Sequence, residues 1–113
     1  MKAFHRYALS ALAAGAAACT PALAQDAQQA QAIAKQHNCL ACHATDKKLV
    51  GPAYQEVAAK YKGDPNAADH LKKKIKEGGA GVWGPTPMPP NPGIGDDELD
   101  VVVGWILGGA PDQ

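Results

Sequence analysis

Three reactive side chains, Cys39, Cys42 and His43, lie within the stretch "HNCLACHATDKKLVGPAY". Two thiols and an imidazole at this spacing suit a redox dithiol, part of a zinc site, a disulfide or the attachment of a haem. A thioredoxin-like dithiol needs a strand before the motif, and no strand pattern precedes Cys39. A zinc site needs four ligands, and residues 25–113 contain no third cysteine. A disulfide across two intervening residues would close a very small loop and stabilise little.

The order Cys-x-x-Cys-His is the attachment sequence of c-type haem. In that chemistry the thiols of Cys39 and Cys42 form thioether bonds to the porphyrin, and the imidazole of His43 binds the iron. Of the four alternatives, only this one uses all three side chains. The motif therefore predicts one covalent haem c, which is attached outside the cytoplasm.

The iron position opposite His43 decides the function. Met88 is the only methionine of residues 25–113, and it lies in the proline-rich segment 80–95, "AGVWGPTPMPPNPGIG". Dense proline makes a stiff loop that can hold one side chain in place. We therefore expect Met88 as the second iron ligand, with His70 as the rival. If the position were open, oxygen, peroxide or a gas could bind, and the protein would be a sensor or a peroxidase.

The elements that must position these residues read as helices, since strand patterns are scarce. Asp26 is expected to cap the first helix, Pro52 to lie in the first turn of the second, Gly63 to end the second and Gly78 to end the third. The four predicted helices span residues 27–38, 52–63, 66–79 and 95–109. The fold class is thus all-α, with about four short helices around one haem. The apolar side chains expected to line or back the haem pocket are Tyr54, Val57, Leu71, Ile75, Leu99, Val102, Val103 and Ile106.

The first 24 residues are typical of an export signal. They have a basic start, a short apolar run and the small-x-small sequence Ala22-Leu23-Ala24 before the expected cleavage site. A transmembrane anchor is the alternative, but the run is shorter than the roughly 20 residues that span a bilayer. A lipoprotein signal at Cys19 is a third interpretation. The mature domain is therefore expected to be residues 25–113, in the periplasm and without a membrane span.

Charge is unevenly distributed along the mature domain. Its side chains sum to about −2, from nine Lys against eleven Asp and Glu. Eight Lys and only three acids lie in residues 47–76, whereas residues 96–113 contain five acids and no Lys. This pattern indicates either two solvated helix faces or a molecule with a positive and a negative end, which would orient a charged partner. Nucleic acid is not an expected partner, because the balance is not basic.

Three stretches of the chain together resemble a known family: "CLACHATDKKLVGPAYQEVAAKYKG", "GVWGPTPMPPN" and the last helix with Trp105. They are similar to the small bacterial class I cytochromes c of the cytochrome c-551 type, over nearly all of residues 25–107. The resemblance implies a class I cytochrome c fold and a monomeric periplasmic electron carrier that is not an enzyme. Its implied partners are a quinol-oxidising complex as donor and a terminal reductase or oxidase, for example a nitrite reductase, as acceptor.

The resemblance also implies roles for residues around the haem. Pro52 would accept a hydrogen bond from the His43 ring through its carbonyl, Trp83 would donate one to a haem propionate, and Asn91 would contact the region of the Met88 sulfur. The family often has an arginine facing a propionate where this chain has Lys74, and a single-point cation is a poorer clamp than a planar guanidinium.

Overall fold

The computed structural model describes Gly15 and residues 22–112, except the side chains of residues 22–25. Its elements are α1 (Ala22–Gln36), the 3-10 turn η1 (Cys39–Ala41), α2 (Tyr54–Lys60), α3 (Ala67–Glu77) and α4 (Asp96–Leu107). Within the described residues there is no sheet, only two isolated bridges between single residues. The all-α prediction is confirmed. No described helix is long and apolar enough to cross a membrane.

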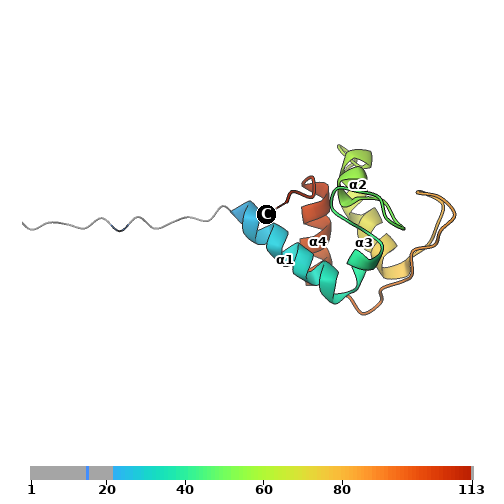
Figure 1. The fold of residues 1–113 in the computed structure, drawn as a ribbon, viewed down its shortest axis with the longest axis horizontal. Coiled ribbons are helices and arrows are strands. Elements are labelled where there is room, and N and C mark those ends of the chain that lie inside the picture. Colours follow the sequence, from blue (N-terminus) through green and yellow to red (C-terminus); the bar gives the residue numbers. More distant parts are fainter. Residues whose placement is uncertain (1–14, 16–21, 113) are drawn as a thin grey trace, which may run out of the picture.

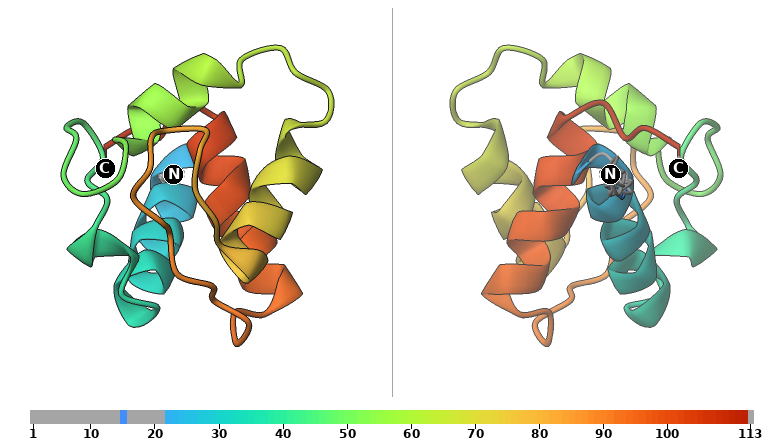
Figure 2. Two further views of the ribbon diagram at one scale, coloured as in Figure 1. Left: turned by 90° about the vertical axis from the view of Figure 1, so that its right-hand side faces the viewer. Right: turned by 90° about the vertical axis from the view of Figure 1, so that its left-hand side faces the viewer.

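Helix α4 is the central element of the fold. It contacts each of the other three α-helices, α1, α2 and α3, as the red ribbon in Figure 1 shows. The long segment between α3 and α4, residues 78–95, crosses one face of the helices before it enters α4 (Figure 2). This face is therefore covered by irregular chain, and the predicted Met88 lies within it.

The sequence of α4 explains both its start and its buried face. The Glu98 carboxylate accepts a hydrogen bond from the Gly95 amide at 3.0 Å, which caps the helix. Acidic residues fill the first turn, where their negative charges interact favourably with the positive end of the helix dipole and stabilise the helix. Its buried side chains include the four expected ones, Leu99, Val102, Val103 and Ile106, which recur at helical spacing, and also Trp105.

Helix α1 differs from the prediction at its start. It begins at Ala22, so Asp26 lies inside the helix and does not cap it. Residues 22–25 are Ala, Leu, Ala and Gln, all good helix formers, so nothing in the local sequence makes the helix begin at Asp26. The expectation that Asp26 caps the helix was wrong for this chain. The lipoprotein alternative at Cys19 lies outside the described residues.

Helices α2 and α3 are present at the predicted places, with shorter bounds for α2. Pro52 precedes the helix rather than occupying its first turn, and Lys60 is its last residue. The chain then makes a turn through Gly63, whose φ is 78°, so this glycine ends the turn rather than the helix. Helix α3 ends at Glu77 as expected. Gly78, which follows it, has a φ of 69°, a backbone angle that residues other than glycine rarely adopt.

Candidate functional site

A cavity of about 350 Å³ lies between the Cys39–Pro52 segment with α2 on one side and the 79–89 segment on the other. This volume falls within the usual range for cofactor pockets. Six of the eight apolar residues expected to line or back the pocket line this cavity, whereas Leu99 and Val103 are buried behind it. The six are Tyr54, Val57, Leu71, Ile75, Val102 and Ile106.

The imidazole of His43 is held from two sides. Its Nδ1 donates a hydrogen bond to the carbonyl of Pro52 at 2.8 Å, so the hydrogen bond expected from the family resemblance is present. A carbonyl can only accept, so the Nδ1 atom carries the proton and the Nε2 atom keeps its lone pair. The ring of Tyr54 stacks on the imidazole with 5.2 Å between centroids. A histidine held this way is oriented as a metal ligand.

Gly51 lets the chain pass this close to the imidazole. A Cβ atom at position 51 would lie 2.5 Å from Cε1 and 2.9 Å from Nδ1 of His43, both too close for any side chain. The amide of Gly51 also donates to the Cys42 carbonyl at 2.8 Å. The sequence analysis gave Gly51 no role, because only the fold shows how near the ring lies.

The two cysteines of the motif line the cavity beside His43 and are not joined by a disulfide. The turn η1 brings them together, since the amides of Cys42 and His43 both donate to the Cys39 carbonyl, at 3.2 and 3.0 Å. Burial raises the pKa of the Cys39 thiol. Burial and the neighbouring Cys39 also raise the pKa of Tyr54, so the phenol stays protonated and neutral.

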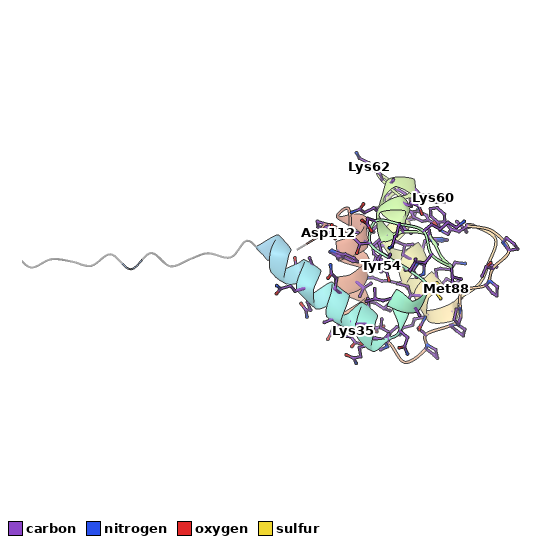
Figure 3. The ribbon with its side chains drawn as sticks, viewed as in Figure 1. Lys35, Tyr54, Lys60, Lys62, Met88 and Asp112 are labelled. Atoms are coloured by element: carbon purple, nitrogen blue, oxygen red, sulfur yellow. The ribbon has the colours of Figure 1, made fainter. Side chains whose placement is uncertain are left out.

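Met88 reaches the same cavity from the opposite segment (Figure 3). Its main chain is fixed by two hydrogen bonds with Gly79, one from each amide to the other carbonyl, both at 2.9 Å. The segment also passes so close to Gly78 that a Cβ atom there would clash with the carbonyl of Met88 and with Pro90. The end of α3 therefore positions Met88 through the backbone, without using its sulfur.

The geometry combines an oriented imidazole, two thiols and a thioether around one apolar cavity. A family model of cytochrome c matches residues 27–110 of the chain. The chain belongs to the cytochrome c family.

Comparison with individual proteins shows which cytochromes c this chain is similar to. It is 52% identical over 93 residues to cytochrome c-551 of Stutzerimonas stutzeri, covering 82% of this chain and 86% of the relative. It is 46% identical over 99 residues to cytochrome c-551 of Pseudomonas aeruginosa, covering 88% and 91%. Its fold is similar to the crystal structure of Nitrosomonas europaea cytochrome c552, with a TM-score of 0.67, 46% identity and coverage of 70% of this chain and 98% of that one. The class I cytochrome c fold is thereby confirmed.

A cytochrome c carries one covalent haem c, and the residues of this cavity suit that group. The walls are mainly apolar, as a porphyrin requires, and both thiols are free at one edge. Among the described residues, no cluster of three or more His, Cys, Asp or Glu could hold a bare metal ion. The residues of the cavity therefore suit an iron that is already coordinated by the four nitrogens of a porphyrin.

Charged and polar side chains at the edge of the cavity include the residues expected near the propionates. Trp83 and Lys74 both line the cavity. Trp83 is 42% exposed, and the ammonium of Lys60, at the end of α2, lies 5.5 Å from the centre of its ring, within cation–π range. Lys48 and Glu56 are the other charged residues that line the cavity, and the Glu56 carboxylate accepts from the Ala53 amide at 2.8 Å.

Asn91 does not line the cavity. Its side-chain amide donates to the carbonyls of Ile75 at 3.3 Å and Pro89 at 3.2 Å, and its main-chain amide donates to Ile75 at 3.1 Å. Asn91 thus fastens the segment that follows Met88 to α3. Its expected contact with the sulfur region stays a prediction.

The two other histidines of the mature domain lie away from the cavity lining. The exposed His70 is within hydrogen-bonding distance of the Tyr61 hydroxyl, at 3.1 Å. His37 contacts the Glu98 carboxylate at 3.0 Å and is half-buried. The His37–Glu98 contact joins residues 61 apart in the chain, and no local sequence pattern predicted it.

Proposed function

We propose that the protein is a periplasmic one-electron carrier in which His43 and Met88 are the two axial ligands of the haem iron. Cys39 and Cys42 would form the thioether bonds. The observation that carries the proposal is that His43 and Met88 line one apolar cavity from opposite segments, each held by hydrogen bonds that leave its ligating atom free. When bound, haem c supplies an iron that exchanges one electron between its ferric and ferrous states.

The residues of the chain would make this exchange fast and selective. Pro52 and Tyr54 keep the imidazole of His43 in one orientation, so little atomic movement accompanies electron transfer. The rigid backbone around Met88 limits escape of the thioether, which is a weak ligand for ferric iron. An apolar lining and a methionine ligand both favour the reduced state and a fairly positive potential. With both axial positions filled, the iron is closed to substrates, so the protein would not act as an enzyme.

Carbon monoxide tests the occupied sixth position. The visible spectrum of the reduced wild-type protein is recorded before and after addition of carbon monoxide. Unchanged bands are expected, whereas Met88→Ala should form the adduct rapidly because its sixth position is open. Rapid adduct formation by the wild type would reject the carrier and favour the haem-based gas sensor or peroxidase.

Residues 1–24 would direct export to the periplasm and be removed there. The proposed cut after Ala24 lies within the first turn of α1, so the mature helix would be three residues shorter. The mass of the exported product tests this proposal, because it should equal residues 25–113 plus one haem. A product that retains residues 1–24 would contradict it.

The expected partners are redox proteins, with a quinol-oxidising complex as donor and a terminal reductase or oxidase as acceptor. Exposed apolar side chains and lysines occur within the attachment motif, at Leu40, and in the segment that follows it, at Lys47, Lys48, Leu49 and Val50. A face of this kind suits small, transient contacts with an acidic partner. Reversal of both lysine charges, Lys47→Glu with Lys48→Glu, should slow association and weaken or reverse its acceleration at low salt, because attraction to an acidic partner becomes repulsion. An unchanged rate would exclude this face as the docking site.

A further inference from the structure

The segment after α4, residues 108–111, folds back on the helix that it leaves. The Ala110 amide donates to the Trp105 carbonyl at 3.0 Å, and the Trp105 indole N–H donates to the Pro111 carbonyl at 3.1 Å. The side-chain amide of Gln55, on α2, donates to the Ala110 carbonyl at 3.4 Å. We call residues 108–111 the clasp, because they hold Trp105 and join the end of α4 to α2 (Figure 2).

Ala110 has an uncommon backbone conformation at the centre of the clasp. Its φ is 47°, in the left-handed region that residues with a side chain rarely adopt, and it is fully buried. Such a conformation persists only where the surrounding contacts fix it. Here the amide and the carbonyl of Ala110 are both hydrogen-bonded, to Trp105 and to Gln55. The clasp is therefore a defined structure rather than an irregular continuation of the helix.

Three rings lead from the clasp to the expected iron ligand. The buried indole of Trp105 meets the ring of Tyr54 edge to face, with 5.3 Å between centroids. Tyr54 also stacks on the imidazole of His43, with 5.2 Å between centroids. Both distances lie in the range in which aromatic rings attract each other. A change in the position of Trp105 is thus passed through Tyr54 to the face of the imidazole.

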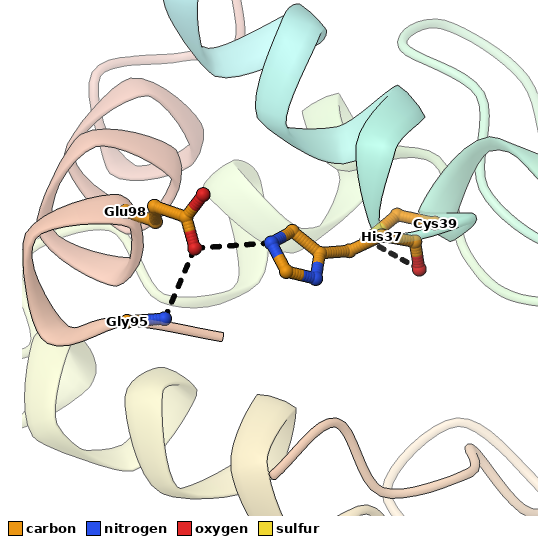
Figure 4. Close-up of polar contacts among 4 residues, drawn as sticks. All are labelled: His37, Cys39, Gly95 and Glu98. Carbon is orange, nitrogen blue, oxygen red and sulfur yellow. Dashed lines mark hydrogen bonds and ion pairs between the residues drawn. The ribbon is translucent and has the colours of Figure 1, made fainter. Parts of the chain in front are cut away.

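Helix α4 reaches the haem-attachment region at two places, and the clasp acts at only one of them. In the first turn of the helix, Glu98 contacts His37, which precedes the attachment motif (Figure 4). Trp105 lies in the last turn instead, and its contacts lead to the imidazole itself. The clasp therefore bears on the orientation of a ligand, whereas the contact at the start of α4 bears on the chain before the motif.

The hydrogen bond to Pro52 fixes one edge of the His43 ring, but a single hydrogen bond lets a ring tilt about it. We propose that Trp105 is a positioning residue for His43: the clasp fixes the indole, the indole holds Tyr54, and Tyr54 prevents the imidazole from tilting. The orientation of the ring is then set by the fold before any partner binds. The effect on the iron rests on the proposed role of His43 as a ligand, whereas the hold on Tyr54 does not.

The experiment compares the haem-loaded wild type with a chain that ends at Gly109 and with Trp105→Phe. These changes remove the same hydrogen bond, from its acceptor and from its donor side. NMR of the reduced protein measures the ring-flip rate of Tyr54 and the exchange of the His43 Nδ1 proton with solvent. Both rates should rise by about two- to tenfold in each variant, the change that corresponds to one lost hydrogen bond.

The oxidised protein reports the ligand directly. The spread of its haem methyl resonances depends on the orientation of the axial imidazole, so this spread should change in both variants. Because Trp105→Phe keeps residues 108–111, it tests the same chain of contacts if the shortened protein does not fold. Adding Trp105→Phe to the shortened chain should change the two rates little further, because the hydrogen bond is already lost.

Two controls separate the clasp from a general loss of stability. A chain that ends at Asp112 keeps residues 108–111, and Ala68→Gly weakens α3, which contributes no ring to these contacts. Both should keep the wild-type rates. Wild-type rates in the two test variants, or effects of the two changes that simply add, would overturn the proposal. If the His43 ring lacked the paramagnetic shift of an iron ligand, the proposed function would be rejected, while the flip rate of Tyr54 would still judge the clasp.

Discussion

Substitution of Gly51 by alanine tests whether the fold, and not only the motif, positions His43. The new Cβ atom would lie 2.5 Å from Cε1 of the imidazole, whereas unstrained carbon atoms stay about 3.5–4.0 Å apart. The ring must therefore move by roughly 1 Å, which breaks its hydrogen bond to Pro52 and disturbs its stacking on Tyr54.

The cost follows from typical values for each change. The lost hydrogen bond contributes about 0.5–1.5 kcal/mol, and overpacking costs about 1–3 kcal/mol. Replacement of glycine by alanine stiffens the unfolded chain and returns about 0.4–1 kcal/mol. Mid-range values leave a net loss of about 2 kcal/mol. For a domain of this size that loss lowers Tm by about 8–16 °C.

Thermal unfolding of the haem-loaded protein, followed by the haem absorbance, measures the loss of stability. The matched control is Gly93→Ala, because a Cβ atom at Gly93 meets nothing within 4 Å. The control should melt near the wild type and keep its spectrum, whereas Gly51→Ala should melt lower with altered axial bands. If Gly51→Ala had the wild-type Tm and spectrum, the argument that Gly51 sets the position of the imidazole would be refuted.

Three further substitutions test other contacts of the site and the core. Gly78→Ala should loosen the Met88 segment, because its Cβ atom would clash with the Met88 carbonyl at a φ of 69°, and the reduced protein should then bind carbon monoxide faster than the wild type. Asn91→Ala should lower the free energy of unfolding by about 0.5–1.5 kcal/mol in urea titrations, since it removes two side-chain hydrogen bonds while the Ile75 carbonyl keeps its main-chain donor. Trp105→Phe should lower it by more than one hydrogen bond contributes, about 0.5–1.5 kcal/mol, because the indole N–H donates to the Pro111 carbonyl at 3.1 Å and the smaller ring leaves space in the core.

Each of these has its own control. Gly104→Ala, in a helix with nothing within 4 Å of the new Cβ, should leave carbon monoxide binding unchanged; equal binding rates in Gly78→Ala and the wild type would contradict the clash. Asn91→Asp places a carboxylate oxygen where the amide donates to the two carbonyls, so it should be destabilised at least as much as Asn91→Ala; an Asn91→Asp variant as stable as the wild type would contradict the role of the amide donor. Equal stability of Trp105→Tyr and Trp105→Phe would be consistent with loss of the indole N–H donor in both. A Trp105→Phe variant as stable as the wild type would contradict the role of that donor.

Much of the fold was predictable because it is encoded locally. The acids in the first turn of the last helix, its apolar spacing and the glycines after its end all indicate the same element, and α4 agrees with them. The start of α1 was not predictable from Asp26, because the residues before it are equally good helix formers. Local signals identify a helix more reliably than they locate its ends.

The residues that the fold brings to one cavity could be singled out from the sequence, whereas the contacts that position them could not. Cys39, Cys42 and His43 form a motif, and Met88 stands out by its rarity in the mature domain. The close approach of Gly51 to the imidazole depends on how the chain folds back after the motif. Such contacts depend on the path that the chain takes between the two residues, and a single sequence contains no local signal for that path.

The pairing of Met88 with Gly79 has a consequence for how such proteins can diverge. Both hydrogen bonds come from the main chain, so the place of residue 88 beside the cavity does not depend on the side chain it carries. Exchange of the sulfur for another donor would then alter the redox range while the surrounding loop kept its path. The same scaffold could in this way serve donors and acceptors of quite different driving force.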